Sequence, residues 1–341
     1  MKHNLKQALA TAALLLCSMV AMAQTTATVD GITYEFITKA KLATVVASES
    51  GSYSGNIVIP EIVEYDGVAY SVTAIGENAF YKCFSLTSVT IPNSVTTIGD
   101  RAFYGCDRLT SITIPNSVTK IGEGAFCCSS LTSMTIPNSV TTIEYGTFQL
   151  CSGLTSVTIP NSVTTIGNDA FSNCERLTSI TIPNSVTIIG GGAFYNCDGL
   201  TSITIPNSVT TIGDNTFMFC SGLTSIVVES GNTNYDSREE CNAIIETTTN
   251  TLVTGCKNTV IPGSVTTIGK YAFFYCYDLT SITIPNSVTT IGEYAFYECD
   301  DLTSITIPNS VTTIRESAFF GCSNLVFRNP KQPKLFRNNQ V

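Results

Sequence analysis

The stretch from Leu86 to Arg108, L-T-S-V-T-I-P-N-S-V-T-T-I-G-D-R-A-F-Y-G-C-D-R, decides the fold because it recurs along the chain with a period of 23 residues. Similar units begin at Leu109, Leu131, Leu154, Leu177, Leu200, Leu279 and Leu302, and the unit from Leu109 lacks one residue. Counting back one period from Leu279 reaches Cys256, which precedes the same Ile-Pro and Ser-Val-Thr-Thr-Ile-Gly motifs. The segment from Leu223 to Gly255 is therefore one longer unit with an insertion.

The apolar residues of each unit predict its local structure. At the start of the unit Leu86, Val89 and Ile91 follow a near-alternating pattern, which indicates a strand. Pro92 lacks an amide hydrogen and ends that strand. The segment 95–98 is a second short extended piece, and after Gly99 most units carry an acidic residue or asparagine just before Ala-Phe. That arrangement predicts a single helical turn with an N-cap.

A unit this short cannot bury its apolar residues alone, so the units must stack. We expect an α/β repeat solenoid that is β-rich: a right-handed stack of about ten turns, with a parallel sheet on one face and short helical turns elsewhere. Residues 24–85 are predicted to form an N-terminal β cap and the first turn, with hairpin turns at Asp30-Gly31 and Asp66-Gly67. The solenoid is predicted to span residues 86–325, with the insertion in the turn 223–255, and residues 326–341 to form a tail.

The first 23 residues have the pattern of a secretory signal peptide. Lys2, His3 and Lys6 precede an apolar stretch over residues 8–20, and Ala21-Met22-Ala23 is a typical cleavage site. We expect cleavage after Ala23 and export of the chain, to be secreted or held at the cell surface. A lipoprotein signal at Cys17 is the alternative, but Leu16 stands where a small residue is required. No later segment has the roughly 20 consecutive apolar residues that would insert into a membrane.

Removal of this segment limits the available chemistry. His3 is the one histidine of the chain, so the mature protein would have no histidine general base, catalytic triad or metal ligand. Its 15 basic residues would face 26 acidic ones, and such a chain is a poor ligand for nucleic acid. Adjacent carboxylates such as Asp300-Asp301 and Glu239-Glu240 are interpreted as solvated surface acids. The sequence therefore predicts a protein that is not an enzyme and that has no cofactor, no metal and no nucleic acid partner.

The repeated L-T-S-I-T-I-P-N-S-V-T-T-I-G-x-x-A-F-x-x-C resembles the BspA-like bacterial surface proteins, whose units are treponemal-class leucine-rich repeats. The resemblance covers residues 57–325 and includes the interruption that begins N-Y-D-S-R-E-E-C. It implies a secreted or cell-surface adhesin that contacts host matrix proteins such as fibronectin and fibrinogen, or other cell surfaces, by protein or glycan binding. Its oligomeric state and ligand are not implied.

Cysteines and hydroxyl side chains recur once per unit. Ten cysteines are interpreted as a column of buried, inert thiols rather than metal ligands: Cys83, Cys106, Cys128, Cys151, Cys174, Cys197, Cys220, Cys276, Cys299 and Cys322. Cys241 and Cys256 flank a predicted hairpin, and we leave open a disulfide or two core thiols. Outward Ser and Thr, such as Ser88 and Thr90, form an array that offers a second function, an ice-binding or other structural solenoid.

Aromatic residues at variable positions gather after the insertion. The candidate partner-binding patch consists of Tyr271, Phe274, Tyr275, Tyr277, Tyr294 and Tyr297, while Phe273 and Phe296 are expected to point into the core. Six rings on two adjacent turns have the composition of a binding hot spot. The alternative is that the insertion folds over the rings with its own Ile244, Ile245, Leu252 and Val253, and makes them a satellite core.

Overall fold

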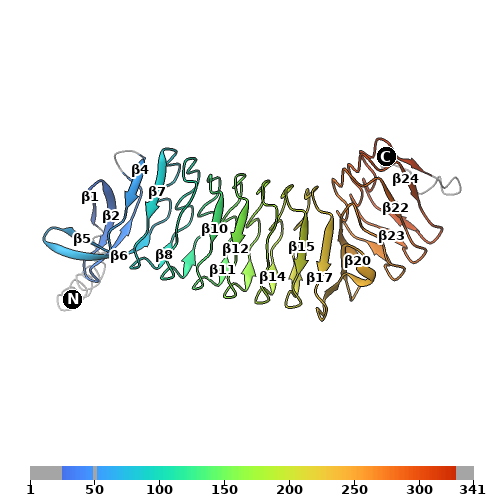
Figure 1. The fold of residues 1–341 in the computed structure, drawn as a ribbon, viewed down its shortest axis with the longest axis horizontal. Coiled ribbons are helices and arrows are strands. Elements are labelled where there is room, and N and C mark those ends of the chain that lie inside the picture. The colour runs from blue at the N-terminus through green and yellow to red at the C-terminus, as the bar shows by residue number, and fades with distance from the viewer. Residues whose placement is uncertain (1–24, 49–51, 328–341) are drawn as a thin grey trace, which may run out of the picture.

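The computed structural model describes residues 25–48 and 52–327. The predicted signal peptide and its cleavage after Ala23 lie outside these residues, as does the tail from residue 328 onward. Within them the chain forms an elongated stack of coils, and the coils after the insertion are turned relative to those before it (Figure 1). The predicted solenoid is confirmed in this respect.

Successive units pair in parallel, one unit apart. Ser202 pairs with Ser225 and Ile203 with Ile226, so each repeat position lies beside its equivalent in the next coil. Strands at the start of the units form the first face, which consists of β4(Gly55–Val58), β7(Leu86–Thr90), β10(Ser133–Thr135), β12(Ser156–Thr158), β15(Ser202–Ile205), β17(Ser225–Val228), β22(Ser281–Thr283), β24(Ser304–Thr306) and β26(Val326–Phe327).

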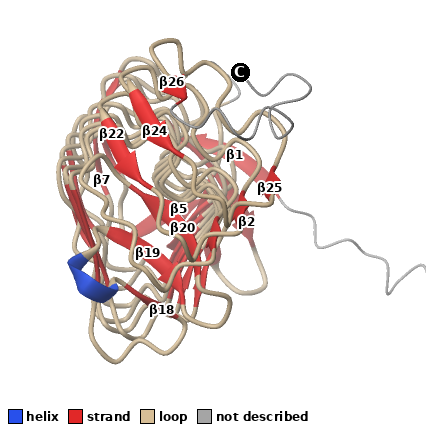
Figure 2. Cartoon of the chain, turned by 90° about the vertical axis from the view of Figure 1, so that its right-hand side faces the viewer, coloured by secondary structure: helices blue, strands red, loops and turns tan. Residues whose placement is uncertain are grey.

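The second face is also a parallel ladder, built from two-residue strands in the Thr-Thr-Ile motif. Its strands are β8(Thr97–Ile98), β9(Lys120–Ile121), β11(Thr142–Ile143), β13(Thr165–Ile166), β14(Ile188–Ile189), β16(Thr211–Ile212), β21(Thr267–Ile268), β23(Thr290–Ile291) and β25(Thr313–Ile314). Viewed along the stack, the strands line the coil on opposite sides and loops join them (Figure 2). The sheet is therefore not confined to one face.

The N-terminal cap consists of two hairpins joined to the stack. Its strands are β1(Thr25–Val29), β2(Ile32–Ile37), β3(Leu42–Val45), β5(Ile62–Tyr65) and β6(Val68–Ile75). Strands β1 and β2 are antiparallel, as are β5 and β6. Both predicted turns adopt positive φ at both central residues, Asp30 and Gly31 in one and Asp66 and Gly67 in the other. The two predicted hairpins are confirmed.

The prediction of short helical turns in the repeats is wrong. In the segment after Gly99, Arg101 and Gly105 have φ values of 52° and 66°, which a right-handed helix does not allow. These two residues and Phe103 donate their amides to carbonyls of the next coil, at 2.7–2.8 Å. The amides between them bond three residues back within the coil. Alternate amides therefore point along the stack, and the segment is a third hydrogen-bonded ladder between coils.

The acidic or asparagine residue after the glycine does not cap a helix, and in two coils its side chain caps the next coil instead. Asp100 Oδ1 accepts the amide of Glu123 at 3.0 Å, and Asn168 Oδ1 accepts that of Gly191 at 2.8 Å. In the described part of the chain the one helix is a 3-10 turn, η1(Arg238–Glu240), in the insertion. This helix is not long and apolar enough to span a bilayer.

Columns of identical side chains fill the interior of the coil. The repeated Leu, Val, Ile and Phe of most units are buried in the core, and the Phe rings stack on one another. From Phe80 to Phe217 seven rings stand 5.0–5.7 Å apart with interplanar angles of 1–7°. The ladder stops at Phe217 and resumes with Phe273, Phe296 and Phe319. It is interrupted at the insertion.

The cysteine column is buried as predicted, except that Cys276 is partly exposed and that Cys128 needs a correction. Cys106 Sγ donates to the carbonyl of Phe80 in the preceding coil at 3.2 Å, and most of the column repeats this contact. Cys128 does not belong to the column. Its unit lacks the residue after Ser130, so Ser129 takes the buried position and Cys128 lies one place earlier, partly exposed, at φ 58°. Cys241 and Cys256 are both free, buried thiols.

Candidate functional site

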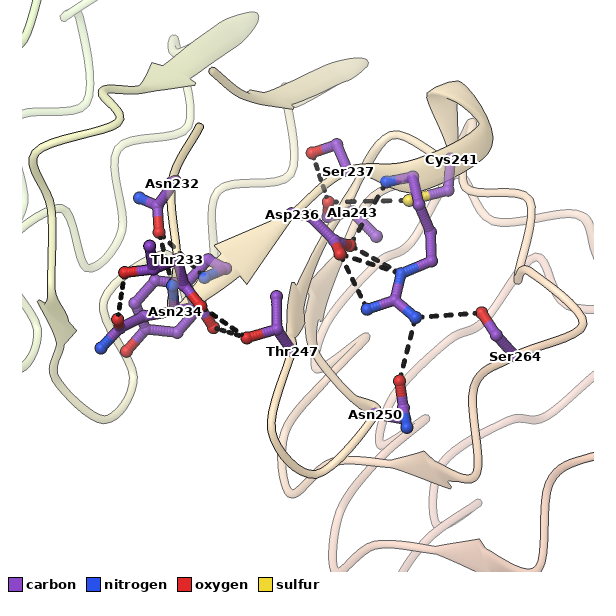
Figure 3. A network of polar contacts seen from close by, with 12 residues as sticks. Asn232, Thr233, Asn234, Asp236, Ser237, Cys241, Ala243, Thr247, Asn250 and Ser264 are labelled. Carbon is purple, nitrogen blue, oxygen red and sulfur yellow. Dashed lines mark hydrogen bonds and ion pairs between the residues drawn. The ribbon is translucent and has the colours of Figure 1, made fainter. Parts of the chain in front are cut away.

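The insertion replaces one coil with a hairpin that is tied to both neighbouring coils. Its elements are β18(Tyr235–Asp236), η1, β19(Ala243–Glu246) and β20(Thr251–Gly255). Asn232 Nδ2 donates to the carbonyls of Pro206 and Val209 in the preceding coil, at 3.0 and 2.9 Å. Arg238 is held by Asp236 at 2.7 Å and donates to Asn250 and to Ser264 of the following coil. These polar contacts fix the position of the insertion, and Figure 3 shows those that reach Asp236, Asn250 and Ser264.

The inserted coil lacks the third ladder segment. Strand β20 pairs with β21 and ends at Gly255, whose amide donates to the carbonyl of Ala272 at 2.8 Å. A Cβ on Gly255 would clash with the Phe273 ring, so that ring occupies the place of the missing side chain. Cys256 follows directly as the first core residue of the next coil. A cavity of about 270 Å³ remains between the coils on this side.

The structure brings the six predicted aromatic residues together beside this cavity. Tyr271 stacks on Tyr294 with ring centroids 5.4 Å apart, and Phe274 stacks on Tyr297 at 4.9 Å. Tyr275 lies 5.6 Å from Tyr297 and 5.3 Å from Tyr277. We call these six residues the aromatic patch.

The rings extend further than the sequence analysis predicted. Phe219 in the coil before the insertion lies 4.3 Å from Tyr275 and 5.2 Å from Phe274, and so joins the two halves of the solenoid across the cavity. Tyr195 and Phe320 continue the cluster at its two ends, at 5.0 and 5.2 Å. These residues stand at the same or the adjacent repeat position as Phe274, so the repeat alignment contained the signal.

The insertion does not bury the patch with the residues proposed for that role. Ile244, Ile245 and Leu252 are fully buried in the core of the solenoid. Val253 lines one side of the cavity, while Tyr271, Phe274 and Tyr275 line the other. All six rings keep part of their surface accessible, and Tyr277 is 40% exposed. The cluster is packed mainly by its own rings and remains open to a partner.

Several of these rings are carried on an unfavourable backbone conformation. Tyr271, Tyr275 and Tyr294 have φ values of 59°, 55° and 56°, and Phe219 has 63°. At these positions other coils mostly have glycine, asparagine or aspartate, such as Gly124 and Asn173, but also Lys82, Arg101, Cys128 and Leu150. A bulky residue at positive φ costs about 1–2 kcal/mol. Aromatic side chains are therefore present here despite a cost in stability.

Acidic groups surround the patch. Burial raises the pKa of Tyr275 and of Tyr277, and the neighbouring tyrosines and the carboxylates of Glu298 and Asp300 raise them further. Lys270 lies 4.8 Å above the Tyr271 ring and forms an ion pair with Glu293 at 3.0 Å. The raised pKa keeps the phenols of Tyr275 and Tyr277 protonated to a higher pH than an ordinary tyrosine, and the protonated phenols can donate hydrogen bonds. Among residues 25–48 and 52–327 no group of three or more His, Cys, Asp or Glu is arranged to hold a metal ion.

The hydroxyl side chains divide into two groups. Thr155 Oγ1 donates to the carbonyl of Thr132 in the preceding coil at 2.9 Å, and threonines at this position and in the Thr-Thr-Ile motif repeat such contacts. These hydroxyls support the stack. The outward Ser and Thr of the first face are mostly exposed, but their strands form separate sheets: β4-β7, β10-β12, β15-β17 and β22-β24-β26. The ice-binding alternative stays a prediction, and a measurement of thermal hysteresis tests it.

Comparison with known proteins agrees with the repeat geometry. The profile of the BspA type leucine rich repeat region matches in six copies, over residues 67–175, 141–254 and 250–329. The chain belongs to this family. No curated protein matches this chain. A leucine rich cell surface protein of Faecalibacterium prausnitzii is similar in structure, with 26% identity and a TM-score of 0.57 over 90% of this chain and 96% of the other.

Two further solved structures share the fold. A leucine-rich repeat protein of Eubacterium ventriosum has 26% identity and a TM-score of 0.53, over 87% of this chain and 70% of the other. The pneumococcal vaccine antigen PcpA has 22% identity and a TM-score of 0.60, over 89% of this chain and 75% of the other. The β-solenoid of stacked parallel coils is thus common to bacterial leucine-rich repeat proteins, and the membership is consistent with a repeat protein that binds partners.

Proposed function

We propose that this BspA-type protein is an exported adhesin, cleaved after Ala23, that binds protein or glycan on host matrix or on other cell surfaces through the aromatic patch. The proposal includes no catalysis, cofactor or metal. The observation that supports it is the placement of Tyr271, Tyr275 and Tyr294 at positive φ. Other coils also have non-glycine residues at positive φ, but among the described residues aromatic side chains take this conformation only at Phe219, Tyr271, Tyr275 and Tyr294. That gathering of strained aromatic residues points to a function for their side chains. Aromatic residues are also the residue type most enriched at binding hot spots.

The repeat suggests variants that separate binding from folding. Asparagine occupies the position of Tyr275 in two other coils, as Asn173 and Asn196, at the same positive φ. We expect Tyr275→Asn and Tyr294→Asn to leave the melting temperature unchanged or slightly raised, because asparagine tolerates this conformation better than tyrosine. Affinity for the partner should fall about tenfold or more, the size of a hot-spot loss.

The measurement is surface plasmon resonance on immobilised fibronectin, fibrinogen and glycan arrays, with whole-cell binding as a further test. Tyr104→Ser is the matched control, because Tyr104 stacks on Tyr81 in a similar ring pair far from the insertion. It should retain full binding. Binding that survives in Tyr275→Asn and Tyr294→Asn would exclude the patch as the contact, and a large drop in melting temperature would show that its role is structural. Failure of the unaltered protein to bind any of these surfaces would contradict the adhesin proposal.

A further inference from the structure

Two acidic residues stand beside the exposed end of the aromatic patch. Glu298 and Asp300 occupy in their coil the repeat positions that Tyr275 and Tyr277 occupy in the preceding one. Backbone hydrogen bonds join the two coils here. The amide of Tyr275 donates to the carbonyl of the residue before Glu298 at 2.9 Å, and the residue after Asp300 donates to the carbonyl of Tyr277 at 3.2 Å. Each acid is therefore the neighbour of one tyrosine across a single coil spacing.

The two carboxylates lack a cationic partner in the described part of the chain. Neither Glu298 nor Asp300 belongs to an ion pair there. The Asp300 carboxylate accepts the neutral hydroxyl of Ser323 at 3.3 Å. Both acidic residues are partly accessible to solvent. Their negative charges therefore remain available to a ligand.

The charge on these acids reaches the exposed ring. Burial raises the pKa of Tyr277, and the nearby Tyr275 and the carboxylates of Glu298, Asp300 and Asp198 raise it further. Asp198 lies on the other side of the insertion, in a coil before it. The ring of Tyr277 thus lies in a negative potential that comes from both sides.

The chain itself shows how a cation is held on this surface. Lys270 Nζ lies 4.8 Å from the centroid of the Tyr271 ring and 3.0 Å from a carboxylate oxygen of Glu293 in the next coil. The face of a tyrosine ring attracts a cation, and a nearby carboxylate adds to that attraction. Tyr277 and Asp300 repeat this pairing of a ring with an acid of the next coil. Among residues 25–48 and 52–327, however, no lysine or arginine lies over the Tyr277 ring.

The Tyr277 ring is accessible to such a group. It is 40% exposed, the largest exposed fraction in the aromatic patch. Its ring contact in the described structure is with Tyr275, at 5.3 Å and an interplanar angle of 77°. At least one face of the Tyr277 ring is therefore not covered by another ring.

We propose that the aromatic patch binds a lysine or arginine side chain of the partner at Tyr277, where the carboxylates of Glu298 and Asp300 hold the cation beside the ring. The inference rests on the proposed function, and it specifies the partner as a protein with an exposed basic segment rather than as a neutral glycan. The overall charge of the chain is complementary to such a segment, with 26 acidic against 17 basic residues. Arginine fits best, because its planar guanidinium stacks on aromatic faces.

The test uses two short peptides that differ in charge alone. The probe is an acetylated and amidated peptide that alternates glycine and arginine, and its match has uncharged citrulline in place of each arginine. Both are titrated into the full-length protein by calorimetry at low ionic strength. We expect the arginine peptide to bind, and the citrulline peptide to bind about tenfold more weakly or not at all. Raising the NaCl concentration from about 50 to about 500 mM should weaken the arginine peptide about tenfold, because salt screens exposed charges.

Matched variants separate the site from general charge attraction. Glu298→Gln/Asp300→Asn removes both carboxylates and should weaken the arginine peptide about tenfold or more. Glu64→Gln/Asp107→Asn removes the same charge from exposed residues near the N-terminal end of the stack, one of them at the repeat position of Asp300, and should bind as the unaltered protein does. Tyr277→Ser should also weaken binding, whereas Tyr277→Phe keeps an aromatic face and should retain it. Thermal melting followed by circular dichroism checks that each variant is folded.

The chain has its own competing source of cations after position 327, in Arg328, Lys331, Lys334 and Arg337. A further variant replaces these residues with glutamine. We expect it to bind the arginine peptide as the unaltered protein does. If the peptide binds this variant but not the unaltered protein, the chain itself supplies the cation and the inference is wrong.

Three other results would overturn the inference: no binding of the arginine peptide, equal binding of both peptides, or equal weakening by the two acidic double variants. If Glu298→Gln/Asp300→Asn binds matrix proteins as well as the unaltered protein does, the proposed function stands and the cation inference falls. A neutral glycan that binds this double variant but not Tyr277→Ser would assign the patch to glycan instead. If the arginine peptide binds while no matrix protein or cell surface does, the adhesin proposal falls and the recognition of a basic segment stands.

Discussion

Phe171→Ala is expected to lower the free energy of unfolding by about 3–5 kcal/mol, the range for removal of a buried aromatic ring. The Phe171 ring is fully buried and lies between Phe148 at 5.4 Å and Phe194 at 5.6 Å, nearly parallel to both. A column of identical rings cannot close over the gap without breaking the register of the backbone ladders on either side. Most of the cavity should therefore persist. Urea denaturation followed by circular dichroism measures the change.

The interruption of the column provides a graded control. Phe217 stacks on Phe194 alone, and its other side lines the cavity beside the insertion. Phe217→Ala should therefore cost clearly less than Phe171→Ala. Phe171→Leu should also cost less, since it keeps most of the apolar volume. Equal losses for Phe171→Ala and Phe217→Ala would show that ring stacking along the column contributes little to stability.

The fold was predictable from sequence wherever one residue had the same environment in every unit. The period gave the parallel register, and the alternation of Leu86, Val89 and Ile91 placed these residues in the core. The helical turns were a wrong prediction because an acidic residue before Ala-Phe has the same local pattern whether it caps its own segment or the next coil. Asp100 caps Glu123, 23 residues away, and local propensity contains no information on that bond.

The candidate site was only partly predictable for a related reason. The six patch residues could be chosen from composition, since they depart from the polar background of the other units. Phe219 was missed because it lies before the insertion, and its contact with Tyr275 exists only because the inserted coil omits a segment. The absence of an Ala-Phe motif between residues 229 and 255 was visible in the sequence.

The stability of the protein should also fall steeply above about pH 9. Burial raises the pKa of Cys106, Cys197 and Cys276 to about 12, and that of Cys151 and Cys241 to about 11, from an ordinary value of 9.0. The folded pKa lies above the unfolded one, so the stability is fully present below about pH 9 and is lost as the pH rises towards 11–12. Each such thiol contributes a slope of about 1.4 kcal/mol per pH unit in that window.

The chain itself supplies the variant that isolates the thiols from tyrosine ionisation. Ser129 occupies the column position in its own coil and is buried there, so serine is compatible with the site. In Cys106→Ser/Cys197→Ser the hydroxyls can donate to the carbonyls of Phe80 and Phe171, which the thiols contact at 3.2 Å, but they do not ionise. Urea denaturation with reductant gives the free energy of unfolding between pH 8 and about pH 10.5. Its slope against pH should be smaller in the double variant than in the unaltered protein, by the contribution of about two protons. An unchanged slope would mean that the alkaline loss comes from other groups, because two buried thiols that ionise only on unfolding must contribute to it.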